Sequence, residues 1–215
     1  MWKKRFLGVI GAALMMSSAA VADTTIVNGM FSSGLDGWTP EGQVYEAGEK
    51  AWFDDEEGGS LGRLSQVFTI SNDTEFLSFD FVFVSNESPE GPEASESGVP
   101  SDFPDAFAAY LLDPVSGDAL AGNPGRDDFY YCDSDGQEIT IASVSGGTVK
   151  LDVSGLRGQE ALLRFELLGM DGDVETLVSL DNVMEIPEVS VVPVPGAALL
   201  GIIGVGIMGL YRRVR

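Results

Sequence analysis

Residues 75–85 read Glu75-Phe76-Leu77-Ser78-Phe79-Asp80-Phe81-Val82-Phe83-Val84-Ser85. Leucine and phenylalanine occupy every second position from Leu77 to Phe83, and Ser78 and Asp80 stand between them. Successive side chains of a β-strand point to opposite faces, so this alternation predicts a strand with one buried face. The other face also becomes apolar at Val82 and Val84. We therefore expect this strand to be central in its sheet.

The same alternation recurs on both sides of this run. In residues 161–168, Leu163, Phe165 and Leu167 alternate with polar or charged neighbours. Further strands are expected at residues 43–47, 50–53, 63–70, 107–112, 139–144, 149–153 and 177–186. Clusters of Gly, Asp and Asn separate these runs, and none of them has sustained helical periodicity. About nine short strands predict an all-β domain at 23–188, an antiparallel two-sheet sandwich of the jelly-roll type.

One segment inside this domain has a different composition. Residues 86–104 are rich in Glu, Ser, Pro and Gly, and they contain hardly any apolar side chain before Phe103. We expect a long acidic loop on the surface of the domain. Long loops in compact domains are either functional or mobile, and the sequence leaves both interpretations open.

The first 22 residues have the three parts of a secretory signal peptide. Lys3-Lys4-Arg5 is followed by an apolar run from Phe6 to Met16 and by the small-residue site Ala20-Val21-Ala22. This order predicts export and cleavage after Ala22, which would start the mature chain at Asp23. The alternative is an N-terminal membrane anchor that is not cleaved.

The other end of the chain is apolar and then basic. Residues 189–211 contain no charged side chain, and Arg212, Arg213 and Arg215 follow at once. About twenty apolar residues suffice to cross a bilayer, and basic residues stay on the cytoplasmic side. We expect a transmembrane helix at about 196–211, with the sandwich domain outside and the short basic end inside.

Taken together, the parts of residues 189–215 resemble a PEP-CTERM sorting signal. The resemblance rests on a Val-Pro-x-Pro motif, the apolar helix that follows it and the terminal arginines. The residues that carry it are Val192, Pro193, Pro195, Arg212, Arg213 and Arg215. Val194 stands where the family has an acidic residue. The resemblance implies a Gram-negative bacterium, an exosortase-type processing enzyme as partner, and delivery to the cell surface or the extracellular matrix. The alternative is a plain C-terminal membrane anchor.

The charge is concentrated in the middle of the chain. Six of the 12 basic residues lie at the two ends and all 34 acidic residues lie in the domain, which leaves that domain with 28 net negative charges. Such a domain repels nucleic acid. The chain has no histidine and one cysteine, Cys132, which excludes Ser-His-Asp and Cys-His triads and the usual zinc sites. No motif frames a pair of carboxylates as a glycosidase would require, so we expect no enzyme activity.

Two motifs at opposite ends of the domain resemble the galactose-binding-like jelly rolls of carbohydrate-binding modules. Asn28-Gly29-x-Phe31, followed by Gly34 to Trp38, opens the domain, and Ser179-Leu180-Asp181-Asn182-Val183 closes it. The resemblance implies that the two motifs lie side by side. In the modules an acidic residue that helps to bind calcium often follows the opening Phe, whereas Ser32 stands there in this chain.

Calcium is the cofactor that the composition favours, because Ca²⁺ binds six to eight oxygen ligands and this domain is rich in carboxylates. Three pairs are candidate metal ligands: Asn28 with Asp181, Glu87 with Asp105, and Asp133 with Asp135. The alternative for each pair is an ordinary acidic turn in water.

Sugar binding requires aromatic rings on which the apolar faces of sugars stack. Trp52, Tyr130 and Tyr131 are the candidate ligand-binding residues because they stand beside acidic turns, whereas Trp38 belongs to the opening motif and is expected in the core. The alternative is that all of these rings are buried.

These observations favour a non-catalytic exported protein that binds extracellular polysaccharide, with or without calcium. A second hypothesis is a structural matrix component that acts through its acidity and through calcium bridging, without a specific ligand. A polysaccharide hydrolase is the third and least supported.

Overall fold

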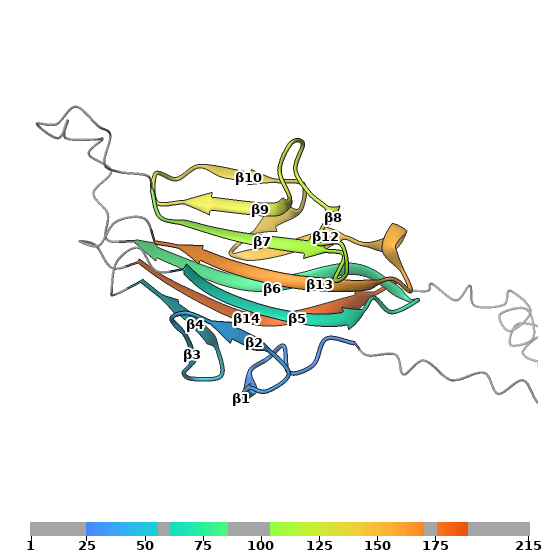
Figure 1. The fold of residues 1–215 in the computed structure, drawn as a ribbon, viewed down its shortest axis with the longest axis horizontal. Helices are drawn as coiled ribbons and strands as arrows, with labels where there is room; N and C mark the ends of the chain where they lie inside the picture. Colours follow the sequence, from blue (N-terminus) through green and yellow to red (C-terminus); the bar gives the residue numbers. More distant parts are fainter. Residues whose placement is uncertain (1–24, 56–60, 86–103, 170–175, 189–215) are drawn as a thin grey trace, which may run out of the picture.

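The computed structural model describes residues 25–55, 61–85, 104–169 and 176–188, and in these ranges almost all regular structure is β-strand (Figure 1). A single 3₁₀ turn, η1, covers Ser154–Leu156. The strands are β1 (Ser32–Leu35), β2 (Thr39–Glu41), β3 (Val44–Glu46), β4 (Ala51–Asp54), β5 (Leu61–Thr69), β6 (Thr74–Ser85), β7 (Ala106–Leu112), β8 (Ala119–Ala121), β9 (Asp128–Asp133), β10 (Glu138–Thr140), β11 (Ser143–Ser145), β12 (Thr148–Asp152), β13 (Glu160–Leu168) and β14 (Thr176–Pro187).

All of these strands except β1 form two antiparallel sheets that pack face to face. The seven-stranded sheet has the order β10-β9-β7-β13-β5-β2, with β8 beside β7, and the six-stranded sheet has the order β11-β12-β6-β14-β4-β3. The longer strands pair as β9-β7-β13-β5 and β12-β6-β14-β4, which is the strand order of a jelly roll. The predicted all-β, two-sheet jelly-roll fold is therefore confirmed.

Aromatic rings from both sheets fill the space between them. Phe79 of β6 is 1% exposed. Its ring lies 5.0 Å from the Phe165 ring of the opposite sheet, measured between centroids, and 6.2 Å from the Phe129 ring, in edge-to-face arrangements. Edge-to-face rings add to the free energy gained by burying them. The inward-facing side chains of residues 75–85 therefore lie at the centre of the core.

The strand β6 is central, as predicted, because it pairs with β12 on one side and β14 on the other. Val82 and Val84 on its second face are nevertheless 54% and 49% exposed. The pairing with β12 ends at the pair Asp80–Thr148, so only β14 accompanies the last part of β6. These two valines lie on the outer face of the six-stranded sheet.

One predicted strand was wrong, and four strands, β1, β2, β8 and β9, were not predicted. Residues 139–144 form two strands in different sheets, because the chain turns at Thr140, whose hydroxyl donates to the Phe129 carbonyl and accepts from the Ala142 amide. The strand β9 was not predicted, because an irregularity in its pairing with β7 places two successive aromatic residues, Phe129 and Tyr130, in the core. This breaks the period of two that sequence reasoning relies on.

Several predicted segments lie outside the described residues. They are the signal peptide at 1–22 with Ala20 and Ala22, most of the acidic loop at 86–104, and the sorting tail at 189–215. Within the described ranges no helix is long and apolar enough to cross a membrane.

Two residues of β6 that point to opposite faces, Phe79 and Val82, allow a matched stability test. Phe79→Ala should lower the free energy of unfolding by about 3–5 kcal/mol because it leaves a cavity among the core rings. Val82→Ala, on the outer face of the same strand, should cost less than about 1 kcal/mol. Urea unfolding of the full chain followed by tryptophan fluorescence measures both, and comparable losses would contradict the assignment of faces.

Candidate functional site

The candidate site lies on the outer face of the six-stranded sheet, along β14. Direct strand pairing places Val82, Ser179, Trp52 and Tyr45 in one row across β6, β14, β4 and β3. Directly paired residues point to the same side of a sheet. Ser179 is small and 5% exposed, whereas Val82 and Tyr45 are 54% and 44% exposed. The surface of the sheet is therefore depressed at Ser179, between the larger side chains of Val82 and Trp52.

The next row along β14 is polar. Asp181 of β14 is paired with Asp80 of β6, which is paired with Thr148 of β12. Like charges directly opposite one another on a sheet repel, so this arrangement needs hydrogen-bond donors to hold it. The Thr148 hydroxyl donates to Asp80 Oδ1, and Asn182 Nδ2 donates to Asp80 Oδ2 at 2.8 Å. Asp181 Oδ1 accepts from the backbone N–H of Asn182 at 2.7 Å.

Asn182 reaches this row because β14 is irregular there. The strand register shifts between Asp181 and Met184. Asn182 has a backbone φ of 50°, a value that residues other than glycine seldom adopt. The following N–H, of Val183, donates to the Gly29 carbonyl at 2.9 Å. A Cβ at Gly29 would lie 1.8 Å from the Val183 carbonyl oxygen, so glycine is required for this approach. The opening and closing motifs thus lie side by side, as their resemblance to galactose-binding-like domains implies.

A hollow of about 300 Å³ opens at the polar row. This volume is at the lower end of those of small-ligand sites. We call the hollow and the row beside it the β14 trough, made up of Tyr45, Lys50, Trp52, Asp80, Val82, Thr148, Ser179, Asp181 and Asn182.

Trp52 is held in place before any ligand binds. Its indole N–H donates to the Ala47 carbonyl in the turn between β3 and β4 at 2.9 Å. A ring whose orientation is already fixed loses little conformational entropy on binding. The trough therefore combines an ordered aromatic side chain with carboxylate, amide, hydroxyl and ammonium groups, which suits a ligand that has apolar faces and many hydroxyl groups.

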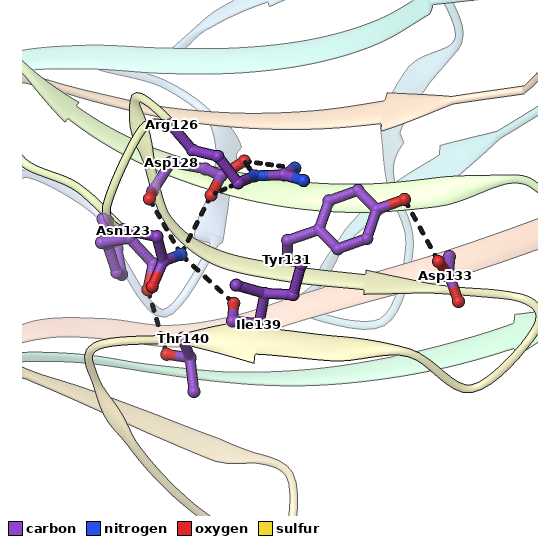
Figure 2. Close-up of polar contacts among 8 residues, drawn as sticks. Asn123, Arg126, Asp128, Tyr131, Asp133, Ile139 and Thr140 are labelled. Carbon is purple, nitrogen blue, oxygen red and sulfur yellow. Dashed lines mark hydrogen bonds and ion pairs between the residues drawn. The ribbon is translucent and has the colours of Figure 1, made fainter.

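Tyr131, a predicted ligand-binding residue, lies on the other sheet (Figure 2). Its hydroxyl donates to Asp133 Oδ2 at 3.2 Å, and the Arg126 guanidinium carbon lies 4.2 Å from its ring centroid. Arg126 in turn donates to both carboxylate oxygens of Asp128. Burial, and then the charge of Asp133, raise the pKa of Tyr131 to about 12. The Arg126 guanidinium therefore covers one face of the Tyr131 ring, and the Tyr131 hydroxyl already has a hydrogen-bond partner within the protein.

Tyr130 does not form a surface platform. It is 1% exposed, and its ring packs edge-to-face against Phe79 and Phe81. The expectation that it binds a sugar is corrected, because the pairing irregularity in β9 turns this residue into the core.

Residues of two predicted metal pairs have hydrogen-bond partners of their own. The Asn28 amide is occupied by its own turn, where it donates to the carbonyls of Gly34 and Asp36 and accepts from Ser33 N. Asp133 accepts from Gln137 N and from Tyr131, while Asp135 is exposed in the turn that follows. Glu87 lies outside the described residues. Within the described ranges no group of three or more His, Cys, Asp or Glu side chains is placed to hold a metal ion.

Sequence reasoning found Trp52 and Asp181, which the structure brings to one face, but it missed Asp80, Asn182 and Thr148. Asp80 was recognised only as an outward residue of a strand. Its role depends on which strands pair with β6 and in which register, and a single sequence specifies neither. Asn182 was part of the closing motif, and its place beside Asp80 depends on the irregularity in β14.

No family model matches this chain, and no curated protein matches it significantly. Several solved structures are similar to it. TmCBM61 in complex with β-1,4-galactotriose has a TM-score of 0.44 at 13% identity, over 77% of this chain and 99% of that chain. CBM28, a carbohydrate-binding module specific for non-crystalline cellulose, has a TM-score of 0.38 at 16% identity, over 75% of this chain and 93% of that chain.

A third similar structure is the enzymatically active domain of the bacteriophage CBA120 tailspike protein 4. Its TM-score is 0.41 at 12% identity, over 77% of this chain and 22% of that chain. At such low identities and TM-scores these likenesses concern the sandwich fold alone.

Asn182 affects stability through its side-chain hydrogen bond to Asp80 and through its strained backbone, and mutations can separate the two effects. Asn182→Ala loses the hydrogen bond to Asp80 and keeps the strained backbone, and should lower the free energy of unfolding by about 2 kcal/mol. Asn182→Gly loses the same bond but relieves the strain, and should cost about half as much. Urea unfolding measures both variants. Equal losses would show that the positive φ carries no strain.

Proposed function

We propose that this chain is a non-catalytic polysaccharide-binding protein and that the β14 trough is its binding face. The observation that carries the proposal is that Asp80, Asp181 and Asn182 line one hollow with Val82, while Trp52 lies in the row beside it, paired with Ser179. Sugar rings have apolar faces that pack on aromatic and aliphatic side chains and hydroxyl groups that donate to carboxylates. The trough offers both kinds of contact within two rows of the sheet.

The charges of the trough favour a neutral glycan. Asp80 and Asp181 place two carboxylates in the hollow, and Lys50 is the one basic side chain among the residues that line it. The surrounding domain is also strongly acidic. A polysaccharide of uronic acids or sulfated sugars would be repelled, whereas neutral hydroxyl groups can donate to the carboxylate oxygens.

The pair Asp80–Asp181 does not have the arrangement of a glycosidase. Hydrolysis requires two carboxyl groups that flank the scissile bond from opposite sides. Here the two side chains are neighbours on the same sheet face, and both are held by hydrogen bonds from within the trough. This supports binding without catalysis, as the sequence predicts.

The two ends of the chain support a proposal about location. A signal peptide at 1–22 and a sorting tail at 189–215 would deliver the domain through the inner membrane to the cell surface or extracellular matrix of a Gram-negative bacterium. An exosortase-type enzyme would then act on the tail. This proposal rests on the sequence features described above, because both ends lie outside the described residues.

Binding can be tested with the full chain in a non-glycosidic detergent by affinity electrophoresis through neutral galactan, mannan and β-glucan, with polygalacturonate as the anionic comparison. At least one neutral glycan should retard the chain, and Trp52→Ala should weaken that binding at least about tenfold, which corresponds to about 1.4 kcal/mol. Trp52→Phe should lose less, because it keeps an aromatic ring.

Tyr131→Ala on the opposite sheet is the matched control, with thermal melting used to confirm that each variant folds. It should bind like the wild type. Loss of binding in Tyr131→Ala together with normal binding in Trp52→Ala would move the site to the seven-stranded sheet. Retardation by no neutral glycan would contradict the proposed function.

Export can be tested by expressing the full chain in a Gram-negative host that has an exosortase, and in the same host without it. Mass spectrometry should show a mature N-terminus at Asp23, and loss of the terminal arginines only where the exosortase is present. A full-length precursor that stays soluble in the cytoplasm would contradict the localisation.

A further inference from the structure

Two buried carboxyl groups meet at one end of the sandwich, away from the trough. Asp55 follows β4 of the six-stranded sheet, and Asp105 directly precedes β7 of the seven-stranded sheet. They are 1% and 0% exposed. A buried carboxylate is unfavourable unless a proton, a cation or several hydrogen-bond donors compensate its charge.

The compensation at Asp55 is incomplete in the described part of the chain. Its Oδ1 accepts from the backbone N–H of Thr176 at 2.6 Å. Its Oδ2 is buried and has no hydrogen-bond donor, and no ion pair of the described residues includes Asp55. Asp105 lies within hydrogen-bonding reach of the Asp55 carboxyl. Two acids therefore face each other, and one of them has an oxygen without a donor.

Two further contacts of this pair involve the backbone. A Cβ added to Gly169 would lie 2.7 Å from Asp55 Oδ2, so the main chain reaches the carboxylate directly. The Ser134 N–H donates to the Asp105 carbonyl at 2.9 Å, and the Ser134 hydroxyl is itself buried without a hydrogen-bond partner. Carboxylate oxygens are the ligands that Ca²⁺ prefers, and the Asp55 Oδ2 atom is buried here with no hydrogen-bond donor.

We propose that Asp55 and Asp105 bind a divalent cation of the calcium type, which ties the end of β4 in one sheet to the start of β7 in the other. The two carboxylates balance the charge of the ion, and backbone carbonyls and water complete its coordination. Asp105 is also one of the calcium ligands predicted from the sequence, and Glu87, its predicted partner, lies outside the described residues.

Protons compete with the cation at this site. Burial raises the pKa of Asp55 from 3.8 to about 6; the Thr176 N–H opposes this rise and Asp105 adds to it. A raised pKa contributes stability below the unfolded value that is lost as the pH rises through about 6. Without a cation, the folded state is therefore weakened between pH 4 and 7, and a cation restores it above pH 6.

The test is thermal unfolding of the full chain in EDTA, in 1 mM CaCl₂ and in 1 mM MgCl₂, at pH 7.5 and at pH 5. Calcium should raise the melting temperature at pH 7.5 by about 5 °C or more, and by much less at pH 5. Magnesium should have a smaller effect, because it demands stricter octahedral coordination. Isothermal titration should show calcium binding at pH 7.5, and binding accompanied by release of protons near pH 6.

Asp55→Asn should abolish most of the calcium response, and in EDTA at pH 7.5 it should melt no lower than the wild type because it removes a buried charge. Asp135→Asn, in an exposed turn, is the matched control and should respond to calcium like the wild type. The proposal is overturned if calcium leaves the wild type unchanged, or if Asp55→Asn keeps the full response.

Discussion

The alternation of side chains along the paired strands β6 and β14 is the constraint on which both the core and the candidate binding face depend. Phe79 and Phe81 point inward to the aromatic core, and Asp80 and Val82, the residues beside them, point outward to the trough. A shift of the β6–β14 register by one residue would bury the carboxylates and expose the phenylalanines. The hydrophobic core therefore fixes the position of the polar groups that we assign to ligand binding.

The two outer faces of the sandwich handle charge differently. On the seven-stranded sheet, Arg63 binds Glu41 and Glu166, Arg126 binds Asp128, and Arg164 lies over the Tyr110 ring. Carboxylates there are balanced by guanidinium groups. In the trough, Asp80 and Asp181 are held instead by hydroxyl and amide donors. In the proposed complex, sugar hydroxyl groups would add further hydrogen bonds to these carboxylates. This contrast is the reason for placing the ligand on the six-stranded sheet.

Much of the fold could be predicted from one sequence, because strands such as β5, β6 and β13 have the period of two that burial of one face imposes. Prediction failed where that period is broken, at the irregularity in β9 that buries Tyr130, and where a single apolar run divides between two sheets at residues 139–144. The site was harder. Trp52 and Asp181 were selected by residue type and motif, but Asp80 and Asp55 acquire their roles only from strand pairing and from contacts between distant segments.

The most direct test of this account is chemical-shift mapping of the isotope-labelled chain titrated with an oligosaccharide of the glycan it retains most strongly. The account predicts that the Trp52 indole N–H and the amides of Asp80, Ser179 and Asn182 shift together with saturation. Amides around Tyr131 and Arg126 should stay in place. Shifts confined to β7, β9 and β13, with no change at the indole of Trp52, would contradict the assignment of the trough as the binding face.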